Sequence, residues 1–240
     1  MKALILNSGM GTRLGDLTRD KPKGLLEIGG GYTLLGRQLE LLSQLGVTQA
    51  VITTGPFASL LEGYVRGLEL PMDITFVPNE DYARTNYIQS MHLAAPLLDG
   101  HETLLLHGDL VLEESVLWDL LLSPVSVMAV DSSAPLPEKD FKARLWEGRI
   151  VAVGVDLFGP DCVACQPAYR FRAEDFSAWL TAIADFVQRG DVRVYAENAF
   201  NALQGRLPLY PLELHGRLCN EIDDPQDLAQ VGHRFLKTLG

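Results

Sequence analysis

The sequence predicts an α/β fold with a mostly parallel sheet. Its alternation of apolar and amphipathic segments supports this prediction. In the first half of the chain, short apolar segments alternate with amphipathic segments of helical periodicity. Strands that are separated by helices usually pair in parallel through right-handed crossovers. After about residue 131 the alternation loosens. We therefore expect residues 1–240 to form one domain, with a smaller lobe inserted at about residues 131–215.

Continuous apolar runs predict the strands of the first half, at residues 3–6, 50–54, 74–77, 103–107 and 125–130. Four helices are expected between them, at residues 35–45, 57–68, 88–98 and 114–122. The first helix has the clearest signal, because Leu35, Leu39 and Leu42 recur at helical spacing and Gly46 follows as a stop.

The second half contains three further predicted elements. Glu147-Gly148 separates two apolar segments, residues 145–146 and 149–155, in a pattern typical of a hairpin. Apolar side chains at helical spacing predict a helix over residues 176–187. A last helix is marked at its start, where Asp224 is the expected N-cap and Pro225 the first helical residue.

Composition excludes several classes of protein. The chain has 31 acidic and 20 basic residues, which gives a net charge of −11. An acidic protein lacks the positive surface that neutralises phosphates, so no nucleic-acid partner is expected. The chain contains no run of about eighteen apolar residues, so no membrane span is predicted. The three cysteines, Cys162, Cys165 and Cys219, suggest a reduced protein, and we expect a cytoplasmic one.

One loop concentrates positive charge in this acidic chain. It follows the first predicted strand, at the edge of the sheet where open α/β folds bind ligands. Gly9 and Gly11 let the backbone approach a ligand closely, and consecutive N–H groups in such a turn bind anions. Four of the twenty basic residues fall within eleven positions of this loop: Arg13, Arg19, Lys21 and Lys23. The loop therefore predicts a polyphosphate site.

The loop matches neither of two common phosphate-binding motifs. The P-loop string G-x-x-x-x-G-K-[ST] does not occur in the chain. The dinucleotide fingerprint G-x-G-x-x-G is broken, because Leu14 stands where the third glycine belongs and Gly15 comes one place late. A nicotinamide-dependent oxidoreductase is therefore disfavoured.

The loop instead resembles the signature of a nucleotidyltransferase family. Gly9-Met10-Gly11-Thr12-Arg13-Leu14, followed by Pro22-Lys23, is similar to the G-x-G-[ST]-R-L and P-K motifs of sugar-1-phosphate nucleotidyltransferases and bacterial choline-phosphate cytidylyltransferases. His107-Gly108-Asp109 and Glu221-Ile222-Asp223 resemble the two acidic motifs of the family, and residues 79–93 its cytidylyltransferase segment. Three further segments resemble the 2-aminoethylphosphonate cytidylyltransferase branch: residues 136–143, Gln166-Pro167 and residues 195–199.

The resemblance implies a Rossmann-like, mostly parallel sheet of the nucleotide-diphospho-sugar transferase type, with a smaller substrate lobe. It implies that Arg13 binds the β- and γ-phosphates, that Lys23 bridges the α-phosphate and the acceptor, and that Asp109 and Asp223 bind Mg²⁺. The implied nucleotide site comprises Leu6, Asn7, Ser8, Gly9, Met10, Gly11, Thr12, Arg13, Thr54, Gly55 and Asn86. The implied substrate site comprises Lys23, Asp140, Lys142, Gln166, Tyr195, Glu197 and Asn198.

Several of these assignments have a competing interpretation. Lys142 is either a solvated charge of the hairpin or an inward contact to the acceptor. Glu197 and Asn198 either bind the acceptor or cap a helix that starts near Ala199. Asp223 is assigned to the metal because Pro225 gives its neighbour Asp224 the role of helix cap.

The reaction implied by the family is attack of a phosphate or phosphonate oxygen on the α-phosphorus of CTP, with pyrophosphate leaving. The nucleophile is ionised near neutral pH, so catalysis depends on positioning and charge stabilisation. The expected partners are CTP and a small zwitterionic amino-phosphonate or phosphate, with 2-aminoethylphosphonate favoured, and the expected assembly is a monomer or homodimer. The alternatives are a phosphocholine cytidylyltransferase, a sugar-1-phosphate nucleotidyltransferase and a nucleotide-sensing module without turnover.

Overall fold

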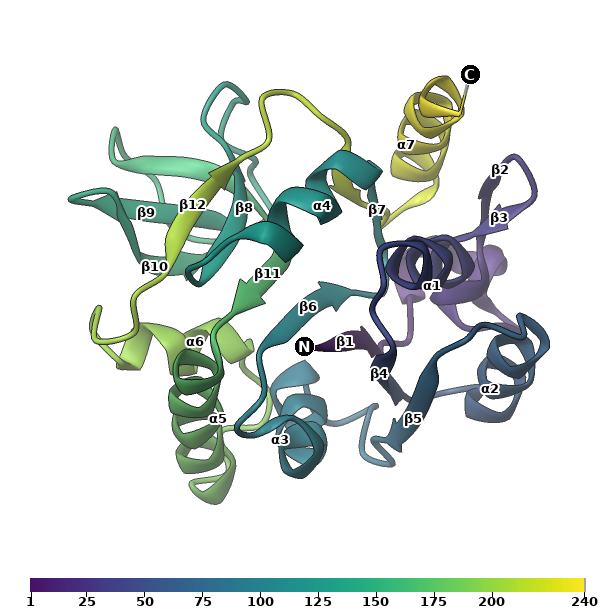
Figure 1. Ribbon diagram of the computed structural model, residues 1–240, viewed down its shortest axis with the longest axis horizontal. Helices are drawn as coiled ribbons and strands as arrows, with labels where there is room; N and C mark the ends of the chain where they lie inside the picture. Colours follow the sequence, from purple (N-terminus) through teal and green to yellow (C-terminus); the bar gives the residue numbers. More distant parts are fainter. Residues whose placement is uncertain (240) are drawn as a thin grey trace.

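A computed structural model describes residues 1–239, and a nine-stranded mixed sheet forms its centre (Figure 1). The strands of this sheet are β1 (Lys2–Asn7), β4 (Gln49–Thr54), β5 (Asp73–Pro78), β6 (Thr103–His107), β8 (Val127–Asp131), β9 (Lys142–Trp146), β10 (Arg149–Gly154), β11 (Cys162–Phe171) and β12 (Tyr210–Glu213). Their order is β10-β9-β11-β6-β1-β4-β5, and β8 pairs with both β11 and β12.

The parallel half of the sheet is built from β6, β1, β4 and β5. Strand β1 lies between β6 and β4 and is buried on both faces. Leu4 and Leu6 belong to the hydrophobic core on one face, and Ala3 and Ile5 belong to the core on the other. Burial on both faces explains why β1 appears in the sequence as an apolar run. The predicted mostly parallel α/β fold is confirmed.

Helices cover both faces of the sheet. On one face lie α3 (Tyr87–Leu98), α5 (Ala173–Gln188) and α6 (Ala196–Ala202), and α3 packs beside α5 (Figure 1). On the other face lie α1 (Leu34–Gln44), α2 (Ala58–Gly67) and α4 (Glu114–Leu122). The four helices predicted for the first half are confirmed, each with bounds within one residue of those expected.

The middle segment extends the main sheet by antiparallel pairing. Strand β11 joins β6, β8 and β9, so residues 131–215 contribute β9 to β12 to the same sheet. Strand β11 was not predicted from the sequence, because Pro167 and a register shift between Cys165 and Tyr169 interrupt its pattern. The expected hairpin is confirmed as β9 and β10, which Glu147 and Gly148 join with φ angles of 49° and 74°.

Two small sheets and the last helix, α7 (Pro225–Thr238), complete the fold. Strand β7 (Leu110–Leu112) pairs with β13 (Cys219–Glu221), and β2 (Glu27–Gly29) pairs with β3 (Tyr32–Thr33). Helix α7 packs against β2, and a third hydrophobic core joins them through side chains that include Ile28, Val231 and Phe235. Two short 3₁₀ segments, Thr12–Thr18 and Lys23–Leu25, form the loop after β1. No helix among the described residues combines the length and apolarity needed to cross a membrane.

The N-terminus of α7 separates the roles of two neighbouring aspartates. The side chain of Asp224 accepts hydrogen bonds from the backbone N–H groups of Gln226 and Asp227, at 2.7 and 3.0 Å. The carboxylate of Asp227 in turn accepts from the N–H of Asp224 at 3.1 Å, which completes a capping box. The predicted cap at Asp224 and Pro225 is confirmed, and the side chain of Asp223 takes no part in the cap.

We expect Asp224→Ala to lower the melting temperature by about 2 to 4 °C, because the first turn of α7 loses the acceptor for two N–H groups. Circular dichroism at rising temperature measures the shift. Gln226→Ala, an exposed change in the same turn, serves as the control and should leave the melting temperature within about 1 °C. Equal melting temperatures for the two variants would contradict the cap assignment.

Candidate active site

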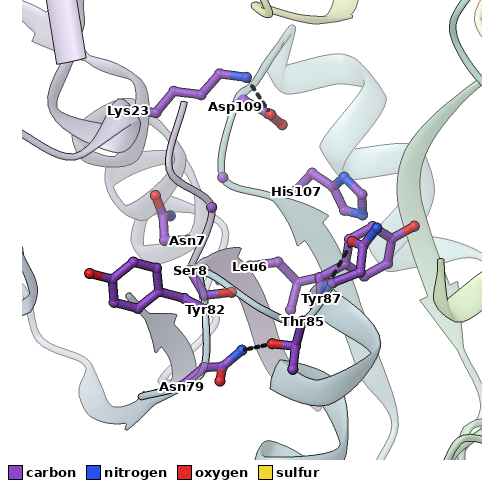
Figure 2. Close-up of a pocket in the computed structure, with 13 residues that line it drawn as sticks. Leu6, Asn7, Ser8, Lys23, Asn79, Tyr82, Thr85, Tyr87, His107 and Asp109 are labelled. Atoms are coloured by element: carbon purple, nitrogen blue, oxygen red, sulfur yellow. Dashed lines mark hydrogen bonds and ion pairs between the residues drawn. The ribbon is translucent and has the colours of Figure 1, made fainter. Parts of the chain in front are cut away.

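A cavity lies at the carboxyl ends of the parallel strands (Figure 2). Its walls come from the end of β1, the end of β6 and the segment between β5 and α3. The lining residues are Leu6, Asn7, Ser8, Gly9, Lys23, Asn79, Tyr82, Thr85, Asn86, Tyr87, His107, Gly108 and Asp109. We call this the first cavity. Its place agrees with the general rule that open α/β sheets bind ligands at this edge.

Asn7 is held at the base of the first cavity by two glycines. A Cβ atom on Gly108 would lie 2.2 Å from the Nδ2 atom of Asn7, and one on Gly24 would lie 2.4 Å from its Oδ1 atom. Both positions therefore require glycine if the Asn7 side chain is to keep its place. The Nδ2 atom is buried without a hydrogen-bond partner among the described residues, so this amide can donate to a ligand in the cavity.

The loop after β1 exposes backbone donors beside the first cavity. The N–H groups of Gly9, Met10 and Gly11 donate no hydrogen bond to another described residue. Gly11 has a φ of 63°, and the Thr18 hydroxyl donates to its carbonyl oxygen at 2.9 Å, which fixes the turn. A turn that exposes consecutive N–H groups suits an anionic ligand, as the sequence predicts.

Four charged side chains converge beside this loop. The ammonium of Lys23 lies 2.7 Å from Oδ2 of Asp109 and 2.8 Å from Oδ1 of Asp223. The guanidinium of Arg13 lies 2.8 Å from Oδ2 of Asp223. Figure 2 shows Lys23 extending to Asp109 at one end of the first cavity. The two aspartates that the sequence analysis assigns to a metal therefore already share one cationic group.

The charges of this cluster stabilise one another. Burial by itself lowers the pKa of Lys23, but the negative charges of Asp109 and Asp223 outweigh burial and raise that pKa above its usual value. Burial by itself raises the pKa of Asp109, but the positive charge of Lys23 outweighs it and lowers that pKa. Lys23 and Asp109 are therefore both charged at neutral pH.

A second cavity shares Asn86, Tyr87, His107 and Asp109 with the first. Its remaining walls come from the loop after β1, the segments on either side of the β9–β10 hairpin, the N-cap of α6, the end of β13 and the residues after it. These residues are Arg13, Lys139, Asp140, Phe141, Val155, Tyr195, Glu221 and Asp223. The shared residues mean that ligands in the two cavities would meet at Asp109.

Aromatic rings form one side of the second cavity. The ring centroids of Tyr87 and Tyr195 are 5.9 Å apart, and those of Phe141 and Tyr195 are 5.0 Å apart. Tyr87 also packs edge-on against His107 at 4.7 Å. Rings in this arrangement can attract a ligand cation through their faces.

Carboxylates form another part of the second cavity. Burial and the charge of Asp223 raise the pKa of Asp140. Burial and the charge of Asp109 raise the pKa of Glu221 to about 7. The Nδ1 atom of His107 lies 3.3 Å from Oε1 of Glu221. Burial by itself lowers the pKa of His107, but this contact outweighs burial and raises it.

The structure brings only part of the predicted nucleotide site to the first cavity. Leu6, Asn7, Ser8, Gly9 and Asn86 line it, while Met10, Gly11 and Thr12 lie in the adjoining loop and Arg13 lines the second cavity. Thr54 and Gly55 line neither cavity. Thr54 is fully buried, and a Cβ atom on Gly55 would lie 2.3 Å from the carbonyl oxygen of Ser8. The lack of a side chain on Gly55 lets the end of β4 approach the end of β1 closely.

The predicted substrate residues also divide into two groups. Asp140 and Tyr195 line the second cavity, and Gln166 lines a neighbouring hollow together with Asp140 and Asp223. Lys142, Glu197 and Asn198 line neither cavity. For these three residues the cavity lining does not support direct contact with an acceptor.

Lys142 is neither a solvated charge nor a cavity residue. Its side chain is fully buried, and its ammonium donates to the carbonyl oxygen of Pro137 at 2.7 Å. The same ammonium lies 4.2 Å from the ring centroid of Phe158. Lys142 therefore ties the segment before β9 to the sheet, because these contacts replace the water that the ammonium loses on burial.

Glu197 acts behind the aromatic side of the second cavity. Its buried carboxylate accepts hydrogen bonds from the hydroxyl of Tyr87 and, at 2.8 Å, from the hydroxyl of Tyr169. Burial and the charge of Glu197 raise the pKa of Tyr87, which keeps its hydroxyl a donor. Glu197 thus holds the Tyr87 ring in place, while Asn198 is exposed in the first turn of α6.

Several lining residues were missed from the sequence. Asn79, Tyr82 and Thr85 line the first cavity, and the Nδ2 atom of Asn79 donates to Thr85 at 3.0 Å (Figure 2). Tyr87 and His107 line both cavities. A signal was present, since Asn79 lies two residues after a predicted strand and the carboxyl ends of parallel strands share one edge.

The fold and this edge-of-sheet site define a class of nucleotide-binding α/β proteins. Residues 3–154 match the family model described as the MobA-like NTP transferase domain, and the chain belongs to this family. A CMP-5'-(3-aminopropyl)phosphonate synthase of Streptomyces rubellomurinus (strain ATCC 31215) is 34% identical over 136 residues. The match covers 57% of this chain but only 21% of that relative, so the chain spans about a fifth of its length.

Two longer matches extend over nearly the whole chain. A 2-aminoethylphosphonate cytidylyltransferase of Lancefieldella rimae is 23% identical over 242 residues, which is 99% of this chain and 94% of the relative. A solved structure of CTP:phosphocholine cytidylyltransferase from Streptococcus pneumoniae superposes with a TM-score of 0.76 at 21% identity and covers 97% of each chain. The fold predicted from the resemblance, the nucleotide-diphospho-sugar transferase type, is confirmed.

We expect Gly108→Ala to lower the free energy of unfolding by about 1–3 kcal/mol, because the new Cβ atom displaces the Asn7 side chain. Urea denaturation measures the change. The control is Gly63→Ala on α2, where a Cβ atom meets nothing within 4 Å. That change should raise the free energy of unfolding by about 0.5–1 kcal/mol, because alanine favours a helix. A Gly108→Ala variant as stable as the parent would refute the close approach.

Proposed function

We propose that the chain is a Mg²⁺-dependent cytidylyltransferase. It transfers CMP from CTP to a small amino-alkyl phosphonate or phosphate, and 2-aminoethylphosphonate is the favoured acceptor. The observation that carries the proposal is the convergence of Arg13, Lys23, Asp109 and Asp223 beside a loop with free backbone donors. The names of the cytidylyltransferase relatives support CTP and an amino-phosphonate as the substrates.

The donor atoms present fit a divalent cation. Asp109 and Asp223 both bind the Lys23 ammonium, so their carboxylates already accommodate one shared cation. The Oδ1 atom of Asp109 is buried without a hydrogen-bond partner among the described residues. Carboxylate oxygens are the protein ligands that Mg²⁺ prefers. Bound there, Mg²⁺ would supply neutralising charge for the triphosphate.

The residues of the chain would act by position and charge. The N–H groups of Gly9 to Gly11 hold the triphosphate, and Arg13 stabilises the pyrophosphate as it leaves. Lys23 lies between the α-phosphate and the acceptor oxygen and offsets the charge of both. A bond forms from the acceptor oxygen to the α-phosphorus, and the bond from that phosphorus to the pyrophosphate oxygen breaks. No side chain needs to remove a proton, because the acceptor oxygen is already ionised.

The second cavity suits an acceptor that carries a cation. Asp140 and Asp223 give it a negative wall, and Tyr87, Phe141 and Tyr195 give it an aromatic one. An ammonium group is stabilised by both kinds of wall. The cavity also lies next to Arg13 and Asp109, where the phosphonate end of the same molecule would meet the nucleotide.

Phosphocholine is the second candidate acceptor, and the three aromatic rings favour it. Ala196 occupies the sequence position where choline-type relatives can carry an aromatic residue. Tyr87, Phe141 and Tyr195 instead supply aromatic faces from other segments of the chain. Quaternary ammonium groups bind well to such faces, because methylation removes their hydrogen-bond donors but keeps their charge.

A substrate screen tests the proposal. The full chain is mixed with CTP, UTP or GTP, with Mg²⁺, and with one acceptor at a time, and pyrophosphate release is followed. The acceptors are 2-aminoethylphosphonate, phosphocholine and glucose-1-phosphate. We expect CTP with 2-aminoethylphosphonate to give at least tenfold higher kcat/KM than every other pair. Turnover with the sugar phosphate alone would overturn the proposal, and nucleotide binding without any turnover would favour a sensing module.

Lys23→Ala should reduce kcat by about a hundredfold or more, which corresponds to roughly 3 kcal/mol of lost transition-state stabilisation. Steady-state rates with the best substrate pair measure the effect, and circular dichroism checks the fold. Lys237→Ala removes an exposed lysine in the last turn of α7 and should keep kcat within twofold. A Lys23→Ala enzyme with a kcat like that of the parent would exclude a catalytic role for this ammonium.

A further inference from the structure

A second group of potential metal ligands adjoins the Lys23 ion pairs. His107, Asp109 and Glu221 each offer one ligand atom, and these atoms lie within 4.8 Å of one another. His107 ends β6, and Asp109 follows it by two residues. The antiparallel pairing of β7 with β13 places Glu221 opposite Leu110, so backbone hydrogen bonds keep the three residues close.

One ligand atom of this group lacks a partner. The Oδ1 atom of Asp109 is buried and forms no hydrogen bond with another described residue. His107 is only 8% exposed, so water has little access to its ring. A buried polar atom without a partner costs roughly 1–3 kcal/mol. Unpartnered atoms in a native structure often indicate an ion or a ligand.

The separation of the ligand atoms fits one ion. Two ligands that lie about 2.1 Å from a metal at right angles to each other are about 3 Å apart. The Nδ1 atom of His107 lies 3.3 Å from Oε1 of Glu221, close to this value. Lys23 contacts Oδ2 of Asp109 and leaves Oδ1 free. An ion bound through Oδ1 therefore need not displace Lys23, whereas an ion between Asp109 and Asp223 competes with it.

We propose that His107, Asp109 and Glu221 form a second divalent-metal site, which prefers a first-row transition ion such as Co²⁺ or Zn²⁺ over Mg²⁺. The imidazole determines the preference, because Mg²⁺ favours oxygen ligands whereas Co²⁺ and Zn²⁺ bind imidazole nitrogen well. Asp109 belongs to both sites and would bridge two ions. All three ligands line the second cavity, so such an ion would face the anionic end of an acceptor. The role of this ion in the reaction rests on the proposed function, whereas metal binding by these three residues does not.

Calorimetric titration of the nucleotide-free chain with Co²⁺ alone and with Mg²⁺ alone tests the preference. We expect Co²⁺ to bind at least ten times more tightly than Mg²⁺. His107→Asn should weaken Co²⁺ binding at least tenfold and leave Mg²⁺ binding within twofold, and Glu221→Gln should also weaken Co²⁺ binding. His233→Asn, which removes an exposed histidine of α7, should change neither affinity. Unchanged Co²⁺ affinity in a folded His107→Asn variant would overturn the site.

Anomalous scattering from a Co²⁺-soaked crystal of the parent protein gives an independent readout. We expect a peak within about 2.4 Å of a His107 nitrogen and of carboxylate oxygens of Asp109 and Glu221. A peak between Asp109 and Asp223 without contact to His107 would overturn the proposal. Neither readout uses CTP or turnover. If the protein binds Co²⁺ at this site but shows no cytidylyltransferase activity, only the proposed function is contradicted. If it shows that activity but does not bind Co²⁺ at this site, only the metal site is contradicted.

Discussion

The ion pairs of Lys23 are the interaction on which the site depends. This ammonium joins Asp109 and Asp223, which stand 86 and 200 residues away in the sequence. All three side chains are largely buried, and a buried charge is costly unless an opposite charge lies beside it. Lys23 therefore couples the loop after β1, the end of β6 and the segment before α7. Both cavities open on this junction, so their shape depends on the same contacts.

Backbone structure holds the charged residues in place. Asp109 accepts a hydrogen bond at its carbonyl oxygen from the N–H of Ile222, at 3.0 Å, next to the pairing of β7 with β13. Asp224 takes the cap of α7, which frees the adjacent Asp223 side chain for Lys23 and Arg13. Gly24 and Gly108 leave room for the Asn7 side chain. The ionic cluster thus rests on hydrogen bonds and close packing rather than on the flexibility of long side chains.

The antiparallel part of the sheet supports the second cavity from behind. Lys142 and Glu197 are both buried charged residues, and neither reaches a cavity. Lys142 binds backbone carbonyls before β9, and Glu197 binds the hydroxyls of Tyr87 and Tyr169. Residues in segments that resemble a family motif can therefore orient a binding surface without being part of it. The residues packed against them form the surface itself.

Local patterns in the sequence determined the parallel strands, the helices of the first half, the hairpin, the cap of α7 and the glycine-containing loop after β1, because each depends on residues close together in the chain. The tertiary structure alone decided that β11 joins β6, that Glu221 meets His107, and that Lys142 is buried. These features depend on the register between distant strands, which hydrophobic periodicity does not specify when polar residues and proline interrupt it, as in β11. The sequence identified Lys23, Asp109 and Asp223 as separate motifs, and only strand pairing brought their charges within hydrogen-bond distance.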